Sequence, residues 1–352
     1  MKIGINTCGC NHARNGAGSF LLSFISNLPK SDEFSFEIFG LEEDRFIYTS
    51  GTELSYTSVP NEKKAAKIIS KKQYDAVLFP APEKGSIKCG KSKSVLMLNY
   101  LFSMVKDKKK KKTLKKNLKK ADFIIAFSEA IKTDLVDNGF SACSIRVVYN
   151  GLDHKIFYPV LNLDSDILDI KPFAIKRPYF IYCSSISGAE KNHLNLIRAF
   201  EIFKKKTGLP QRLVIAGNDG EYSETLHKAV FDSSCAEDIF ITGYFPFESL
   251  AKLYAGSDAC VFPARNEGVG MPVLEAMACG VPVICSKSGA LPEMGGDAPL
   301  YFNPEDADEI ASLMEKVVQN QELRSEMIKK GSERVSEFNW ETTVAEILNV
   351  LK

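Results

Sequence analysis

The chain has 352 residues, of which 45% are apolar and 25% are charged, and its net charge is +1. This length can hold two ordinary domains, and no apolar run approaches the roughly 18 to 20 residues that span a bilayer. The first residues turn polar too early for a secretory leader, so we expect a cytoplasmic protein. The nine cysteines lack zinc-site spacing, which favours reduced thiols.

In the first half, short β-rich runs alternate with longer helical patterns. The strands are expected at 2–6, 34–39, 54–59, 75–79, 95–98, 123–127 and 145–149. The helices are expected at 18–28, 62–71 and 129–138.

The second half repeats this alternation. Strands are expected at 179–183, 212–216, 239–242, 259–262 and 282–285. Helices are expected at 192–206, 223–231, 247–255 and 272–279, and the tail from about Asp306 is helical throughout. Several strand runs are apolar on both faces, as parallel strands covered by helices on each side are.

Between the halves, the periodicity fades and prolines interrupt a predicted linker. We therefore predict an α/β fold of two Rossmann-like, doubly wound domains facing a cleft. The N-terminal domain spans 1–158 and the C-terminal domain 177–335, and a final helix, 336–352, packs back toward the N-terminal domain. Ligands bind such sheets beyond the carboxyl ends of the strands.

The most informative segment runs from Pro263 to Ser286, where a predicted strand leads through a glycine-containing loop into a helix. Such a helix start offers free N–H groups and a positive dipole end to a phosphate. Two carboxylates flank the loop, Glu267 before it and Glu275 one turn into the helix. Carboxylates accept hydrogen bonds from sugar hydroxyls, so the combination indicates a sugar-nucleotide site. A tight strand-to-helix turn alone would explain the glycines but not both carboxylates.

Residues 267–280 resemble the signature of glycosyltransferase family 4, in which two glutamates lie eight positions apart within a Gly- and Pro-containing loop. The resemblance implies a GT-B fold, an N-terminal acceptor domain and a C-terminal nucleotide-sugar donor domain. It also implies that Glu275 binds the ribose and that Glu267 orients the donor sugar. The remaining donor-binding candidates in this loop and helix start are Gly268, Val269, Gly270, Met271, Pro272 and Val273.

A second anion-binding pattern is a small-residue loop that ends at Lys191, before the predicted helix. The resemblance makes Lys191 the cation that stabilises the departing diphosphate, with Asn192 beside it. Many relatives carry an Arg six residues earlier, where this chain has Ser185. Either the diphosphate is bound by one cation fewer here, or Arg265 or another basic residue replaces that Arg. His193 is interpreted as a helix-face residue.

Further donor contacts are expected from the family likeness at Gly217 and Phe245, with the base against the 243–245 loop. In the N-terminal domain, Asn15, Gly16, Ala17 and Gly18 form a loop after the first strand that is expected to face the acceptor or the cleft. A plain strand-to-helix turn is the alternative, because a lone Gly-x-Gly is weak evidence. Relatives place a His where this chain has Asn99, which can contact a sugar hydroxyl but cannot act as a base near neutral pH.

Residues 106–120 hold ten lysines and one aspartate, a local charge of +9. The segment is either a solvated helix or a contact for anionic lipid, since each basic residue near such a surface contributes about 1 kcal/mol. No aromatic interleaving supports nucleic-acid binding. We expect no metal and no resident cofactor; Asp164 and Asp166 mimic a metal motif but fall in the predicted linker.

Together with the family resemblance, these patterns predict a glycosyltransferase that moves a hexose-type sugar from a UDP- or GDP-sugar to a hydroxyl acceptor. The resemblance implies that the transfer retains the configuration of the anomeric carbon. The acceptor is expected to be a glycan or lipid-linked glycan in cell-surface polysaccharide synthesis. Two alternatives stay open: a catalytically weakened sugar-nucleotide sensor or partner subunit, motivated by Ser185 and Asn99, and a phosphorylase or epimerase on the same architecture.

Overall fold

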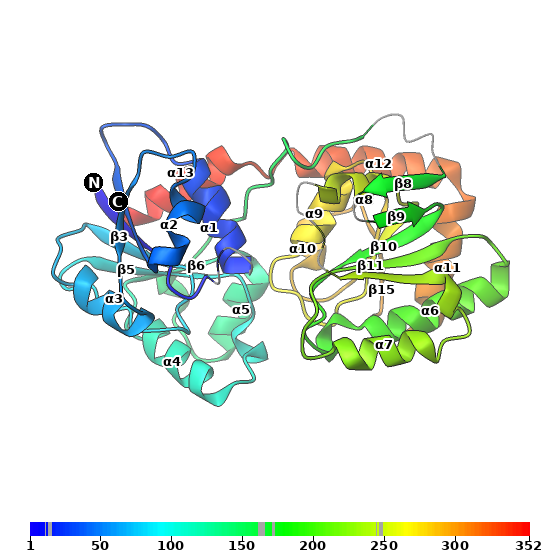
Figure 1. Cartoon of the computed structure of the whole chain (residues 1–352), viewed down its shortest axis with the longest axis horizontal. Coiled ribbons are helices and arrows are strands. Elements are labelled where there is room, and N and C mark those ends of the chain that lie inside the picture. The colour runs from blue at the N-terminus through cyan, green and yellow to red at the C-terminus, as the bar shows by residue number, and fades with distance from the viewer. Residues whose placement is uncertain (11, 13–15, 161–165, 171–172, 244, 246–248) are drawn as a thin grey trace. The chain divides into compact units, whose positions relative to one another are not determined.

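The computed structural model describes all residues except 11, 13–15, 161–165, 171–172, 244 and 246–248. It divides into two compact units (Figure 1). The first comprises Met1–Gly151 together with Phe338–Lys352, and the second comprises Leu152–Glu337. The chain therefore leaves the first unit at Gly151 and returns to it for its last helix.

The first unit contains a seven-stranded parallel sheet in the order β3-β2-β1-β4-β5-β6-β7. Its strands are β1 (Lys2–Asn6), β2 (Ser35–Gly40), β3 (Ser55–Ser58), β4 (Ala76–Phe79), β5 (Lys93–Leu98), β6 (Phe123–Ala126) and β7 (Ile145–Val147). Its helices are α1 (Gly16–Ser26), α2 (Arg45–Thr49), α3 (Glu62–Ile69), α4 (Lys108–Leu118), α5 (Glu129–Asp137) and α13 (Trp340–Leu351). The winding direction reverses between β1 and β4.

The second unit has a six-stranded parallel sheet in the order β12-β11-β10-β13-β14-β15. Its strands are β10 (Tyr179–Cys183), β11 (Arg212–Ala216), β12 (Ile239–Gly243), β13 (Ala259–Phe262), β14 (Val283–Ser286) and β15 (Leu300–Phe302). Its helices are α6 (His193–Thr207), α7 (Ser223–Phe231), α8 (Leu250–Ala255), α9 (Met271–Ala278), α10 (Leu291–Gly295), α11 (Ala307–Gln319) and α12 (Gln321–Val335).

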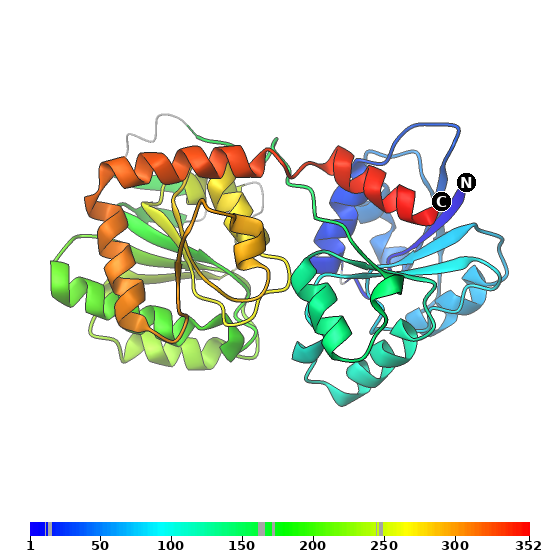
Figure 2. The same ribbon diagram turned by 180° about the vertical axis from the view of Figure 1, so that it is seen from behind.

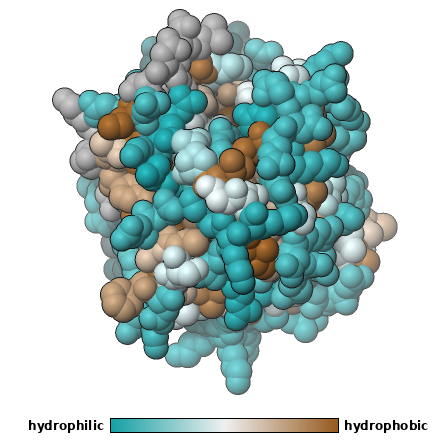
Figure 3. Space-filling model, turned by 90° about the vertical axis from the view of Figure 1, so that its right-hand side faces the viewer, coloured by the Kyte–Doolittle hydropathy of each residue, from teal (hydrophilic) through white to brown (hydrophobic). Residues whose placement is uncertain are grey.

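Helices cover both faces of the second sheet. Helix α6 packs against α7 and α11, whereas α9 packs against α8, α10 and α12 (Figures 1 and 2). Every residue of β10, β13 and β14 is consequently buried, which accounts for the uninterrupted apolar runs in the sequence. The side of the molecule in Figure 3 is mostly hydrophilic, and the apolar side chains of the described residues in view are scattered.

The predicted linker differs from the structure. An antiparallel pair, β8 (Ile167–Ile170) with β9 (Phe173–Lys176), occupies part of it and belongs to the second unit. Alternation in β8 runs exposed, buried, exposed, buried, but four residues are too short a run to separate from an irregular segment by pattern alone. Strand β15 and the short helices α2 and α10 were also missed for this reason.

The last helix is attached to the first unit by close packing. The rings of Trp340 and Phe20 lie 5.5 Å apart, and Thr343 donates a hydrogen bond to the Tyr149 carbonyl at 2.8 Å. Gly151 passes so close to this helix that an added Cβ would lie 2.7 Å from the Trp340 backbone. Among the described residues, no helix combines the length and apolar character needed to cross a membrane.

Replacing Gly151 with Ala should therefore push the α13 start away from the first unit. Overpacking of this kind costs about 1–3 kcal/mol, so the urea unfolding midpoint should fall. Gly85→Ala is the matched control, because its nearest neighbour would lie 3.8 Å away. Equal midpoints for the two variants would contradict this account of the helix.

Candidate functional site

The candidate site lies where β10 and β13 end side by side in the second unit. These neighbouring parallel strands are the point at which the winding of the sheet reverses, and ligands of doubly wound folds bind at such a point. The loop after β10 leads to the short 3₁₀ turn Ala189–Lys191, and the loop after β13 leads to α9. The two sequence motifs are thus brought together by strand order.

An ion pair connects the two loops. The Lys191 Nζ lies 2.9 Å from the Glu267 Oε2, with the side chains 19% and 14% exposed. The sequence patterns predicted that both residues belong to one site, and the structure brings them into direct contact. A partly buried cation beside a carboxylate can exchange that partner for the negative charge of a phosphate.

The second oxygen of Glu267 faces the start of α9. Its Oε1 lies 3.4 Å from the backbone nitrogens of Val269 and Gly270, both of which donate to it. Gly270 adopts φ +81° as the residue before the helix, a conformation that favours glycine. The carboxylate therefore occupies the amide-lined helix start predicted for an anion, and a bound phosphate would compete for these amides.

The Glu267 backbone is fixed by a loop after β14 that sequence reasoning did not single out as functional. Ala290 donates its N–H to the Glu267 carbonyl at 2.9 Å. An added Cβ on Gly289, whose φ is +58°, would lie 2.1 Å from that carbonyl oxygen. Gly289 is therefore required for this approach, and the available signal was its place in Ser288-Gly289-Ala290 directly after a buried strand.

Glu275 lies in the middle of α9, and its hydrogen-bond partner is Tyr254, whose hydroxyl donates to Oε2 at 3.1 Å. Protein atoms surround the carboxyl group, and this desolvation raises its pKa to about 7, although the hydrogen bond from Tyr254 opposes the rise. Glu275 thus sits without a paired cation in the described contacts, unlike Glu267. A group that donates hydrogen bonds would stabilise its charged form.

Val269 and Val273 are buried, and Met271 and Pro272 are half-buried. The N–H of Val273 bonds to the Gly270 carbonyl at 3.1 Å and begins the helix. Pro272 fits this first turn because its missing N–H has no helical acceptor there. The valines accordingly shape the helix start from within the core, whereas backbone groups face the anion position.

Three other predicted donor contacts have structural partners. The Asn192 amide is buried and donates to the carbonyls of Pro263 and Pro304, at 2.9 and 2.7 Å. Gly217 allows the loop after β10 to pass close to its own backbone, since an added Cβ would lie 1.7 Å from the Ser184 carbonyl oxygen. Phe245 is buried and stacks on Phe173 of β9, with ring centroids 5.5 Å apart.

Arg265 is the candidate substitute for the cation expected near Ser185, and its guanidinium pairs with Glu305 through Nη2 and Oε2 at 2.9 Å. Ser185 itself is exposed and contacts Ser187 at 3.1 Å. His193 begins α6, as expected for a helix-face residue, and it is fully buried, with Nε2 3.1 Å from the Ser184 hydroxyl. Burial lowers its pKa to about 4, so the ring is neutral.

In the first unit, Gly16 begins α1 after β1, and Asn99 follows β5. An added Cβ on Gly16 would lie 2.8 Å from the Asn99 amide nitrogen, so these two predicted residues are in contact range. Ala17 and Gly18 form the first turn of α1, whereas Asn15 lies outside the described residues. The structure adds a pair that the sequence did not reveal, His12 Nδ1 with the buried Asp44 carboxylate.

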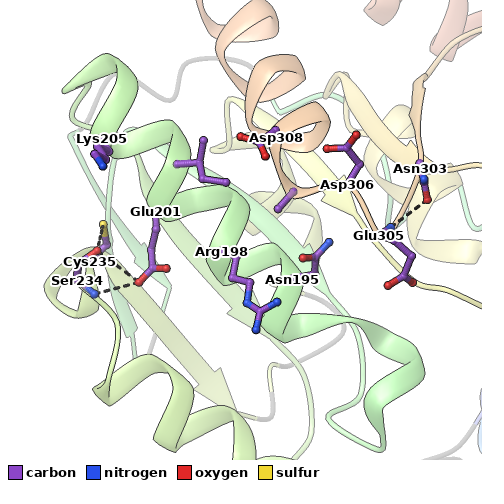
Figure 4. A pocket seen from close by; sticks show the side chains of 12 residues that line it. Asn195, Arg198, Glu201, Lys205, Ser234, Cys235, Asn303, Glu305, Asp306 and Asp308 are labelled. Atoms are coloured by element: carbon purple, nitrogen blue, oxygen red, sulfur yellow. Dashed lines mark hydrogen bonds between the residues drawn. The ribbon is translucent and has the colours of Figure 1, made fainter.

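A groove of about 930 Å³ lies elsewhere on the second unit, between α6 and the start of α11 (Figure 4). Arg198 and Glu201 line it from α6, and Asp306 and Asp308 line it from the opposite side. None of the residues predicted for catalysis or donor binding lines this groove. Among the described residues, no cluster of three or more His, Cys, Asp or Glu is placed to hold a metal ion.

Residues 165–334 match the family model for glycosyl transferases group 1. The O-antigen chain mannosyltransferase B of Escherichia coli is 29% identical over 234 residues, covering 64% of this chain and 61% of that protein. The sulfoquinovosyl transferase SQD2 of Arabidopsis thaliana is 28% identical over 235 residues, covering 65% and 44%. The chain thus spans only about half to three-fifths of the length of these relatives.

Solved structures show the fold over the whole chain. The structure of Anabaena Alr3699/HepE in complex with UDP and glucose has a TM-score of 0.77 and 16% identity, covering 100% of this chain and 99% of that chain. Sucrose-phosphate synthase from Thermosynechococcus elongatus has a TM-score of 0.74 and 20% identity, with 99% and 98% covered. The predicted GT-B class with two Rossmann-like domains is confirmed.

The raised pKa of Glu275 predicts a pH-dependent stability. Between the ordinary pKa of 4.5 and the folded value of about 7, the unfolded state has released this proton and the folded state has kept it. The free energy of unfolding therefore decreases as pH rises through this range. Glu275→Gln should abolish this loss, so the variant gains stability over the unmodified protein by on the order of 2 kcal/mol between about pH 5 and pH 8.

Urea unfolding at several pH values checks the difference. Glu221→Gln serves as the control carboxyl change, since Glu221 is exposed. A Glu275→Gln advantage that is constant with pH would contradict the desolvation of this carboxyl group.

Proposed function

We propose that the protein is a retaining glycosyltransferase of family 4 that moves a hexose-type sugar from a nucleoside-diphosphate sugar to a hydroxyl acceptor. The supporting observation is the Lys191–Glu267 ion pair at the amide-lined start of α9. It lies within the segment that matches the group 1 family model. A GDP-mannose-dependent mannosyltransferase of Corynebacterium glutamicum, 27% identical over 212 residues, and the UDP-bound structure of similar fold favour a GDP- or UDP-sugar donor.

In the proposed mechanism, Lys191 binds the diphosphate and stabilises the negative charge that grows as the sugar–phosphate bond breaks. Glu267, once released by Lys191, accepts hydrogen bonds from the donor sugar. Glu275 accepts hydrogen bonds from the ribose, and Asn99 contacts a sugar hydroxyl. The acceptor oxygen attacks the anomeric carbon from the side that the phosphate leaves, and the departing phosphate oxygen takes the acceptor proton, which gives retention.

A sugar-nucleotide sensor is the second candidate. It is favoured by one observation: Ser185 stands at the position of the second cation, and Arg265 is paired with Glu305. Such a protein would bind the nucleotide sugar without turning it over. Donor hydrolysis and transfer, measured with UDP-glucose, UDP-N-acetylglucosamine and GDP-mannose, separate the two functions.

Helix α4 supports an acceptor in a lipid-linked form, with the protein in the cytoplasm at the inner face of the membrane. Leu114, Asn117 and Leu118 are buried, so the lysines line its outer surface. Asp107 caps the helix by accepting hydrogen bonds from two backbone N–H groups, at 2.8 and 2.9 Å. The charge is therefore presented on an ordered helix, which suits an anionic lipid surface.

The resting ion pair predicts opposite effects of two substitutions on UDP or GDP binding. Lys191→Ala removes the diphosphate cation and should weaken binding at least tenfold. Glu267→Gln frees Lys191 from its carboxylate partner and should strengthen binding several-fold, yet abolish sugar transfer because the sugar contact is altered. Calorimetric titration with UDP and GDP, together with turnover of the donor panel, measures both effects.

The control is Glu315→Gln, which changes a carboxylate of the same unit that pairs with Lys206 at 2.6 Å and contacts neither loop of the site. Weaker UDP and GDP binding by Glu267→Gln would contradict the competition between carboxylate and diphosphate. Unchanged binding by Lys191→Ala would contradict the proposed function itself.

Binding to membranes tests the role of α4. Replacing Lys108, Lys109, Lys110 and Lys112 with Gln should weaken binding to vesicles of phosphatidylcholine with phosphatidylglycerol at least tenfold, given about 1 kcal/mol per basic residue. The same change at Lys63, Lys64, Lys67 and Lys71 removes equal charge from exposed positions. Equal losses in co-sedimentation would show that net charge, and not this helix, governs the contact.

A further inference from the structure

The turn that carries Lys191 is held at each of its three carbonyl groups. The Arg265 Nη1 donates to the Ala189 carbonyl at 2.9 Å, and the Arg265 backbone N–H donates to the Glu190 carbonyl at 2.8 Å. The buried Tyr182 hydroxyl donates to the Lys191 carbonyl at 2.8 Å.

The end of the turn is fixed as well. Asn192 adopts φ +61°, in the left-handed region that is costly for most side chains. Its buried amide bridges the Pro263 and Pro304 carbonyls, which belong to the segments after β13 and β15. Two separate loops thus fix the residue that directly follows Lys191.

Arg265 is itself anchored. Its guanidinium pairs with Glu305, which also lines the groove of Figure 4. The same guanidinium donates to the Ala189 carbonyl, so its planar group connects the Lys191 turn with the segment that carries Glu305. A flexible lysine mounted on a fixed backbone loses less conformational entropy when it binds an anion.

We propose that Tyr182, Asn192 and Arg265 are positioning residues that hold Lys191 where it meets the terminal phosphate of a nucleoside diphosphate. This inference rests on the proposed function and extends it to ligand specificity. The three positioning residues set the preference of the site for a nucleoside diphosphate over the corresponding monophosphate. Arg265 acts through the backbone of the turn and does not replace the second diphosphate cation.

The decisive variant is Tyr182→Phe, which removes one hydroxyl and keeps the ring. Its control is Tyr179→Phe on the same strand, where a buried hydroxyl donates to the Leu253 carbonyl at 2.5 Å. Both variants lose one buried hydrogen bond to a main-chain carbonyl and should lose similar stability. Only the bond at Tyr182 reaches the Lys191 turn.

Calorimetric titration with UDP, UMP, GDP and GMP gives the readout. Tyr182→Phe should reduce the diphosphate-over-monophosphate affinity ratio about three- to tenfold, the size of one hydrogen bond's net contribution, and leave monophosphate affinity unchanged. Tyr179→Phe should leave the ratio unchanged, and Lys191→Ala should abolish the preference. An unchanged ratio in Tyr182→Phe, or equal losses for diphosphate and monophosphate, would overturn the inference.

Arg265→Lys separates positioning from direct charge. It keeps the positive charge but cannot reproduce the fork between Glu305 and the Ala189 carbonyl, so the ratio should fall as it does in Tyr182→Phe. A preserved ratio would assign Arg265 to the diphosphate instead. If the unmodified protein binds neither UDP nor GDP, or if Lys191→Ala keeps the preference, the proposed function fails together with the inference.

Discussion

The ion pair between Lys191 and Glu267 depends on one constraint of the second unit, the adjacency of β10 and β13. The residues are far apart in sequence, but their strands are parallel neighbours and end at the same edge of the sheet. Because the winding reverses there, the connecting helices leave in opposite directions and the two loops face each other. The rest of the site is arranged around this contact.

Electrostatics explains why the pair suits ligand exchange better than permanent stabilisation. Both side chains are mostly withdrawn from water, so each loses hydration that the partner only partly replaces. A diphosphate carries more negative charge than a single carboxylate and can also bind the helix-start amides. The free protein thus keeps its cation oriented by a weaker partner than the proposed ligand.

Local pattern was sufficient to predict most strands of both sheets, and together with the family resemblance it singled out Lys191, Glu267 and Glu275 as candidates. The periodicity of buried strands and the spacing of the glutamates are encoded in contiguous sequence. The positioning contacts could not be predicted this way, since Asn192, Arg265 and Gly289 contact segments that are remote along the chain. The sequence placed His193 on the helix, but its complete burial depends on packing that local pattern does not encode.

Glu267 and Glu275, the two carboxylates of the motif between β13 and α9, differ because their surroundings differ. Glu267 has a lysine and two backbone N–H groups near its oxygens. Glu275 has one tyrosine hydroxyl and is otherwise desolvated, which raises its pKa to about 7. Two glutamates on one loop and helix are therefore not interchangeable. Glu267 already has a cation and two amides as partners, for which a diphosphate can compete. Glu275 gains most from neutral hydroxyl donors such as those of a ribose.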